Sequence, residues 1–188
     1  MATTAELAAW LDAEYLGKKP VDLASGKSVE VARFRRQEKR DKRQKLIDRT
    51  AECWAPNKPA LIFDGGRTCA EIIVVQLLER QGWAARWINN WGGDHCTRLG
   101  RPEPLSRAAD ETLSGINRKA ASRTGKKGGA WDVFACRKDE YLFIESKQYP
   151  SSDDLTDSQK AWLEAALDAG ILPTAFAVMQ HQYGRFEA

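Results

Sequence analysis

Acidic and basic side chains that could share one site fall on two neighbouring predicted strands. Residues 131–136 and 141–148 are rich in apolar and aromatic residues and are joined by a short polar turn, which predicts a β-hairpin. If the connection is symmetric, Asp132 lies directly opposite Glu145, with Cβ atoms about 5 Å apart. Lys147 follows Glu145 by two residues and therefore lies on the same face. The hairpin thus predicts two carboxylates and an ammonium group in one cluster, although a slip of one residue would separate them.

A third carboxylate, Glu71, lies on a strongly apolar helical segment. Its neighbours at helical spacing are Val74, Val75 and Leu78, and a lone glutamate on such a face is unfavourable unless something positive meets it. One interpretation is a buried partner such as an arginine. The other, which we favour, is that Glu71 joins the carboxylates of the hairpin in a single site. The hairpin cluster by itself could likewise be a structural ion-pair network.

The chemistry of such a cluster follows from its donor atoms. Three carboxylates with no histidine or cysteine nearby suit a hard cation, Mg²⁺ or Mn²⁺. A bound ion of this kind polarises a phosphoryl oxygen and activates water. Lys147 would hold or help to deprotonate the attacking water and offset negative charge on the phosphorus. The cluster therefore predicts metal-assisted hydrolysis of a phosphodiester.

Positive charge is concentrated in two stretches, although the whole chain carries a formal net charge of only +3. The first, between Lys27 and Arg49, holds ten basic and four acidic residues and includes Arg35, Arg36 and Arg40. The second contains no acid and consists of Arg118, Lys119, Arg123, Lys126 and Lys127. Concentrated positive charge attracts a phosphate backbone through release of its counterions, so both stretches are candidate nucleic-acid-binding segments. The first could equally be the solvated face of a helix.

Composition limits the class of protein. With 188 residues, of which 43% are hydrophobic, the chain is long enough for one domain with a real core. No apolar run reaches the roughly 18 residues of a membrane span, and residues 1–10 do not resemble a secretion signal. The four cysteines form no CxxC pair, which argues against structural zinc and for reduced thiols. We therefore expect a soluble, cytoplasmic protein with no membrane association.

The elements that must position these residues follow from hydrophobic periodicity and turn residues. We predict a short helix over residues 4–16 and a basic, helix-favouring stretch over 28–54, with a boundary near Pro56. Residues 1–58 would then form a helical accessory segment, and residues 59–188 the main domain. Within that domain we predict, in order, a helix (67–81), a strand (83–90), a loop (91–105), an inserted helix (105–120), the two hairpin strands, a helix (156–169) and a strand (173–180). This order predicts an α/β fold with a small mixed sheet flanked by helices.

The start of the last predicted helix carries a residue with two interpretations. Thr156 and Gln159 have the spacing of a capping box, in which the glutamine side chain returns to the N-cap amide. Gln159 could instead orient a group near the metal. The sequence does not decide between the two uses.

Several of these residues together resemble the PD-(D/E)xK nuclease superfamily. Asp132 is followed after twelve residues by Glu145-Ser146-Lys147, which is similar to the D…ExK pattern. Glu71 matches an acidic residue that members often carry on the first core helix. The order of the predicted elements agrees with the same superfamily.

A further part of the resemblance lies in the helix that follows the E-x-K strand. Gln159 opens this helix and a Trp-Leu pair follows it, which is similar to the virus-type replication-repair nuclease (VRR-NUC) and Holliday junction resolvase-like branch. The resemblance covers about residues 67–180. Trp131 stands where the motif has proline, and a long insertion separates the first two strands, which leaves the substrate geometry open.

The resemblance implies a fold and a set of site residues. The fold is a restriction-endonuclease-like αβββαβ core with an N-terminal helical extension and a helical insertion. Lys147 would be the catalytic lysine and Gln159 an auxiliary site residue. The ligands of Mg²⁺ or Mn²⁺ would be Glu71, Asp132, Glu145 and the backbone carbonyl of Ser146.

The resemblance also implies a substrate and an activity. The expected partner is DNA, with RNA left open, and the expected activity is that of a nuclease in replication, repair or recombination, including structure-selective cleavage of junctions, branches or flaps. A homodimer is compatible with it, because smaller members of the superfamily often act as dimers. Two alternatives are a nucleic-acid-binding or assembly module on the same fold, and an unrelated α/β protein with an ion-pair network.

Overall fold

The computed structural model describes residues 2–41, 58–89, 94–98, 101–125, 128–150 and 154–184. Within these ranges the protein is α/β. Its elements are α1 (Thr4–Trp10), β1 (Glu14–Asp22), β2 (Ser28–Glu38), β3 (Leu61–Phe63), β4 (Gly66–Thr68), α2 (Ala70–Glu79), β5 (Ala84–Asn89), β6 (Asp94–Arg98), β7 (Arg101–Pro102), α3 (Arg107–Thr124), β8 (Val133–Arg137), β9 (Glu140–Tyr149), α4 (Asp157–Leu167), the 3-10 helix η1 (Pro173–Ala175) and β10 (Phe176–Tyr183).

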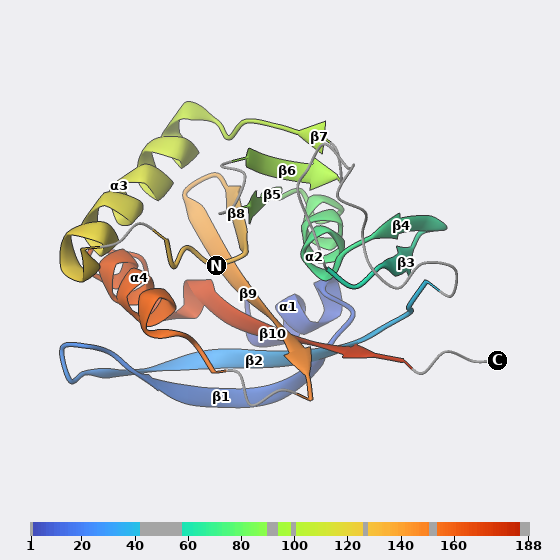
Figure 1. Cartoon of the computed structure of the whole chain (residues 1–188), viewed down its shortest axis with the longest axis horizontal. Helices are drawn as coiled ribbons and strands as arrows, with labels where there is room; N and C mark the ends of the chain where they lie inside the picture. Colours follow the sequence, from blue (N-terminus) through green and yellow to red (C-terminus); the bar gives the residue numbers. More distant parts are fainter. Residues whose placement is uncertain are drawn as a thin grey trace.

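One sheet of eight strands organises the described part of the chain, in the order β1-β2-β10-β9-β8-β5-β6-β7. β10 lies between β2 and β9 and runs parallel to both, whereas the other neighbouring strands are antiparallel. The sheet is therefore mixed. β1 lies at one edge, and a bulge between Tyr15 and Lys18 interrupts its pairing with β2. β3 and β4 form a separate ribbon beside α2 (Figure 1).

Helices cover both faces of the sheet and create two apolar cores (Figure 1). Alternate residues of a strand point to opposite faces. Val133 and Ile144 accordingly join the core beneath α1 and α2, whereas Phe134 and Phe143 join the core beneath α3 and α4. All four side chains are fully buried. β8 and β9 are thus covered on both faces, which explains why their sequences are apolar rather than alternating.

The predicted order of elements is confirmed from the second helix onward. α2, β5, α3, β8, β9, α4 and β10 follow one another as expected, with β6 and β7 added between β5 and α3. The predicted hairpin register is confirmed as well, because Cys136 pairs with Tyr141. Arg137 and Glu140, which were expected to lie in the turn, form one additional pair. The turn between the strands is therefore tight, and Lys138 within it has a φ of 54°. Positive φ angles of this kind are typical of short hairpin turns.

The prediction of a helical N-terminal segment is confirmed in part by α1 and is wrong for residues 28–38. α1 ends at Trp10, and residues 28–38 form β2 rather than a helix; residues 42–54 of the expected helix lie outside the described residues. The Arg- and Glu-rich sequence of β2 favours a helix locally. Pairing with β10 and burial of Val31 and Phe34 in the two different cores stabilise a strand instead.

The sheet also extends across the predicted division at residue 58. β2 lies in the predicted accessory segment and β10 in the predicted main domain, yet the two strands are paired. The described part of the expected helical extension is therefore α1 followed by two strands that belong to the same sheet. β6 and β7, in a segment expected to be a loop, enlarge the sheet on its other side. The sheet is consequently larger than predicted.

Two expectations about the class of protein can be compared with the structure. None of the helices in the described ranges combines the length and the hydrophobicity needed to cross a membrane. Cys69 and Cys136 are free thiols, but Cys96 is disulfide-bonded. The expectation of reduced cysteines is therefore wrong at Cys96.

Candidate active site

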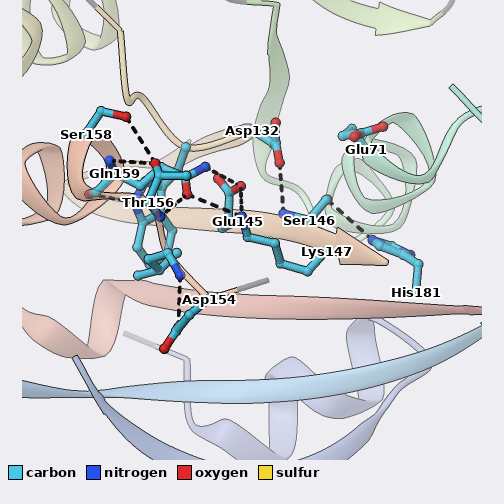
Figure 2. A network of polar contacts seen from close by, with 12 residues as sticks. Glu71, Asp132, Glu145, Ser146, Lys147, Asp154, Thr156, Ser158, Gln159 and His181 are labelled. Carbon is cyan, nitrogen blue, oxygen red and sulfur yellow. Dashed lines mark hydrogen bonds and ion pairs between the residues drawn. The ribbon is translucent and has the colours of Figure 1, made fainter. Parts of the chain in front are cut away.

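Asp132 lies where the chain bends into β8. Its backbone carbonyl accepts a hydrogen bond from the Ile88 amide of β5 at 2.7 Å, which anchors the bend to the sheet. The side chain turns toward β9, where Oδ2 accepts a hydrogen bond from the Ser146 amide at 2.9 Å (Figure 2). The carboxylate is thus held against the E-x-K segment, close to the position that the hairpin register predicts.

Glu145 and Lys147 lie near the start of α4, where Gln159 joins them (Figure 2). Gln159 Nε2 donates to Glu145 Oε1 at 2.5 Å, and Lys147 Nζ donates to Gln159 Oε1 at 3.3 Å. The Lys147 ammonium is also 3.4 Å from Glu145 Oε1. Gln159 Oε1 in addition accepts a hydrogen bond from the Thr156 amide at 2.9 Å and so completes the capping box. Gln159 therefore both caps the helix and orients the cluster.

Glu71 approaches the site from the first turn of α2. Its side chain is buried, and Oε1 forms an ion pair with the ammonium group of Lys58. The charges of Glu71 and Asp132 both act on this ammonium group. Glu71 thus has the buried positive partner that its apolar neighbours predict, but the partner is a lysine rather than an arginine. Glu71 also lies on the side of Asp132 that faces away from Glu145 (Figure 2).

The three carboxylates perturb one another's ionisation. Burial and the charge of Asp132 raise the pKa of Glu145 well above its ordinary value. Burial and the charge of Glu71 raise the pKa of Asp132. Burial also opposes ionisation of Glu71, but the Lys58 ammonium holds the pKa of Glu71 below its ordinary value. When all groups are ionised, the site carries more negative charge than Lys58 and Lys147 compensate, and a further cation would stabilise it.

Two carboxylate oxygens of the site have no donor. Glu71 Oε2 and Glu145 Oε2 are both buried and form no hydrogen bond with any of the described residues, although buried polar atoms are nearly always paired. A hard cation binds oxygen atoms of this kind, so the donor set fits such an ion. The described residues nevertheless contain no group of three His, Cys, Asp or Glu side chains already arranged to hold a metal. The carboxylates would have to move closer together to bind one.

A pocket of about 170 Å³ opens beside Glu71, and its lining includes Lys58, Glu71, Ser146, Lys147, His181 and Tyr183. His181 is buried, with Nδ1 2.8 Å from Glu38 Oε1 and Nε2 3.4 Å from Ser146 Oγ. Sequence reasoning missed both Lys58 and His181. The sequence does contain a signal for His181. It lies two residues beyond Met179 on an apolar strand, so the two side chains point to the same face and His181 is expected to be buried. No periodic pattern marks Lys58.

The first basic stretch does not act as one surface. Arg36 is buried and pairs with Glu38 at 2.5 Å, so it belongs to the interior of the fold and is not available to a phosphate backbone. The Arg40 guanidinium lies 5.8 Å from the ring centroid of Tyr183, which lines the pocket.

Arg35 has a different environment. It pairs across the sheet with Gln180, which in turn pairs with Lys147, so that the three side chains form one row on the same face. The Arg35 guanidinium lies 4.6 Å from the ring centroid of Tyr149. Of these three arginines, Arg35 therefore shares a face with Lys147.

The structure does not bring the second basic stretch to the carboxylates. Arg118 is exposed on α3, Lys119 Nζ donates to the Asp168 carbonyl at 2.9 Å, and Arg123 forms an ion pair with the Asp168 side chain. Asp168 follows α4 at the end opposite Gln159, about 14 Å along the helix axis. Lys119 and Arg123 thus tie α3 to the far end of α4. The other two members of the stretch lie outside the described residues: Lys126 and Lys127.

Comparisons with protein-family models, with curated proteins and with solved structures yield no match. The resemblance to the PD-(D/E)xK superfamily therefore stays a prediction, and the function has to be argued from the geometry of the site.

Proposed function

We propose that this protein is a metal-dependent nuclease that hydrolyses phosphodiester bonds of DNA. The observation that carries the proposal is the pair of buried oxygens without donors, Glu71 Oε2 and Glu145 Oε2, on either side of Asp132. A structural ion-pair network uses its carboxylate oxygens in hydrogen bonds, because an unpaired buried oxygen is unfavourable. Buried carboxylate oxygens without donors, in a charged environment, are what a cation-binding site requires.

The arrangement of the elements supports the same proposal. α2, β5, β8, β9, α4 and β10 follow the αβββαβ order, and the four strands are neighbours in the sheet. β10 returns parallel to β9 after the crossover through α4. This arrangement resembles a restriction-endonuclease-like core that is extended by β1 and β2 on one side and by β6 and β7 on the other.

The residues of the proposed site have distinct tasks. A bound Mg²⁺ or Mn²⁺ would polarise the phosphate and activate water. Lys147 is held by Glu145 and Gln159, and its ammonium group would orient the attacking water and stabilise negative charge that develops on the phosphate. The oxygens that would hold the ion belong to Glu71, Asp132, Glu145 and the backbone of Ser146.

A second candidate is a nucleic-acid-binding or assembly module on the same fold with little or no hydrolysis. The ion pair between Lys58 and Glu71 favours it, because an ammonium group there compensates one carboxylate without a metal. The lack of a ready-made metal-binding group among the described residues favours it too. It gives no account of the free oxygen of Glu145, and we therefore prefer the nuclease.

A cleavage panel separates the two candidates. Single-stranded, duplex, flap and four-way DNA, with a matched single-stranded RNA, are incubated with the full-length protein in Mg²⁺, in Mn²⁺ and in EDTA. We expect cleavage of at least one DNA in one of the metal ions and none in EDTA. Binding of DNA without cleavage in either metal ion would favour the second candidate.

Asp132→Asn is the matched variant for this panel, because an amide keeps the shape of the side chain and an acceptor for the Ser146 amide. Its cleavage rate should fall by roughly a hundredfold or more, while DNA binding in Ca²⁺ stays unchanged. Asp22→Asn, at an exposed position of β1, is the control and should cleave like wild type. Normal turnover by Asp132→Asn would remove Asp132 from the proposed mechanism.

A further inference from the structure

The pocket beside Glu71 is lined by a second lysine, Lys58, to which the proposed function assigns no task. Its backbone is anchored because Ala60 and Leu61, which follow it closely, are fully buried. Its side chain is 38% exposed, so the flexible stem allows the ammonium group to face either the buried carboxylate or the mouth of the pocket. Lys58 Nζ also lies 5.9 Å from the ring centroid of Trp87.

The ammonium group of Lys58 lies beside the oxygen through which Glu71 would bind an ion, because it pairs with Oε1 while Oε2 has no donor among the described residues. It forms an ion pair with Glu71 Oε1, and Asp132 is close enough to act on the same charge. Both acids belong to the carboxylate set of the proposed ion site. An ammonium group on Oε1 and a divalent cation on Oε2 of the same carboxylate repel each other. An ion that binds Glu71 would therefore drive the Lys58 ammonium group away from this carboxylate.

Charge balance indicates what Lys58 would do once an ion displaces it. The carboxylates of Glu71, Asp132 and Glu145, when ionised, exceed the positive charge of Lys58 and Lys147 by one unit. A divalent cation turns this into an excess of one positive charge, provided that Lys58 stays in the pocket. That excess matches the single negative charge of a phosphodiester. A lysine ammonium on a flexible stem is well suited to contact a phosphate as a point charge.

We propose that Lys58 takes the place of a divalent cation against Glu71 in the ion-free protein and contacts a phosphate of the nucleic acid when the ion binds. This inference rests on the proposed function, since it requires Glu71 to be an ion ligand. It predicts two effects of opposite sign. Lys58 weakens the binding of the ion and strengthens the binding of the substrate.

The first effect is measured by calorimetric titration of Mn²⁺ into the full-length protein without DNA. Lys58→Met should bind Mn²⁺ about tenfold more tightly than wild type, because the ion no longer has to displace the ammonium group. Lys58→Arg keeps the positive charge and should stay within about twofold of wild type. Lys19→Met, at an exposed position of β1, is the matched control and should also leave the affinity unchanged.

The second effect is measured with a four-way DNA junction in Ca²⁺ over a series of salt concentrations. Lys58→Met should bind the junction more weakly, and the slope of log affinity against log salt concentration should fall by about one unit, as expected for one lost phosphate contact. Lys19→Met should keep the slope of wild type. A purely structural partner of Glu71 would not change ion binding and DNA binding in opposite directions.

The results distinguish this inference from the proposed function. If Lys58→Met does not fold, Lys58→Gln is used in its place, because glutamine keeps a hydrogen-bond donor for Glu71. The expected changes in Mn²⁺ binding and DNA binding are the same for this variant. Unchanged or weaker Mn²⁺ binding by the variant, together with normal cleavage by wild type, would overturn the role of Lys58 and leave the nuclease in place. No ion binding and no cleavage by any of the proteins would overturn the proposed function and this inference with it.

Discussion

At the scale of single residues, Gln159 links the stability of α4 to the geometry of the carboxylates. Its amide oxygen accepts hydrogen bonds from the Thr156 amide and from Lys147, and its amide nitrogen donates to Glu145. The sequence predicts each use separately, because the spacing of a capping box and the resemblance to a nuclease motif are both visible in it. One side chain can serve both uses only because α4 begins beside β9. This tertiary arrangement cannot be derived from the local sequence pattern.

Thr156→Ala and Gln159→Leu should separate these two uses. Thr156→Ala removes the hydroxyl that accepts a hydrogen bond from the backbone N–H of Gln159. This loss should lower the free energy of unfolding by about 1 kcal/mol. The Gln159 side chain keeps its contacts in that variant, so cleavage should change by less than about threefold. Gln159→Leu removes the contacts to Glu145 and Lys147 and should slow cleavage by about tenfold or more. Denaturant titrations and cleavage rates measure both; an equal loss of activity in the two variants would contradict the assignment.

Glu71 shows where prediction at the residue scale ends. Its apolar neighbours reveal the need for a positive partner, but that partner, Lys58, lies on a segment with no periodic pattern. The same holds for His181, whose contact with Ser146 depends on the parallel pairing of β10 with β9. Those strands are joined through α4 rather than through a turn, and a crossover does not set a register that can be derived from the sequence.

At the scale of elements, the length of a connection decides how much can be predicted. β8 and β9 are joined by a tight turn, so their register follows from the sequence alone. β2 pairs with β10, which is distant along the chain. Its charged composition therefore indicates a helix until the partner strand is known, because local propensity is a weak tendency that tertiary pairing overrides.

Arg33 connects β2 to the start of α4. Its buried guanidinium donates to Asp154 Oδ1 at 3.0 Å. Burial opposes ionisation of Asp154, but the Leu155 amide and the Arg33 guanidinium lower the pKa of Asp154 below its ordinary value of 3.8. A carboxyl group with a lowered pKa stabilises the folded state above its ordinary pKa, and this stabilisation is lost as the pH falls through the folded-state value.

Asp154→Ala should therefore lower the free energy of unfolding near neutral pH. We expect about 1 kcal/mol or less, because the Asp154 side chain is 63% exposed and solvent screens the pair. The difference from wild type should shrink toward zero as the pH falls through the lowered pKa of Asp154, below which Asp154 is protonated in both states. Urea titrations across this pH range measure the effect, with Asp22→Ala as an exposed control. A difference that does not depend on pH would contradict the ion pair.

At the scale of the whole molecule, the site lies where two helical layers meet the same sheet. α2 supplies Glu71 from the layer on one face, and α4 supplies Gln159 from the layer on the other. Asp132 and Glu145 come from the sheet between them (Figure 2). Neither core alone brings these side chains together, so the site should be lost with any change that detaches one layer.

The fragment of residues 59–188, which is the predicted main domain, should not fold on its own. It lacks β2, so β10 loses a parallel neighbour and His181 loses its partner Glu38. It also lacks Val31 and Phe34, which are fully buried in the two cores. Far-UV circular dichroism and thermal unfolding should show a cooperative transition for the full chain and none for the fragment. A fragment that folds and cleaves DNA like the full chain would restore the predicted boundary.

The edge strand β1 has a consequence for how copies of this chain can associate. Besides its bulge, it carries the exposed residues Lys18, Lys19 and Pro20. Charged residues, proline and bulges at a sheet edge hinder the addition of a strand from another molecule. Open-ended, fibre-like growth through β1 is therefore disfavoured, and so is a two-fold assembly that pairs β1 with the β1 strand of a second copy.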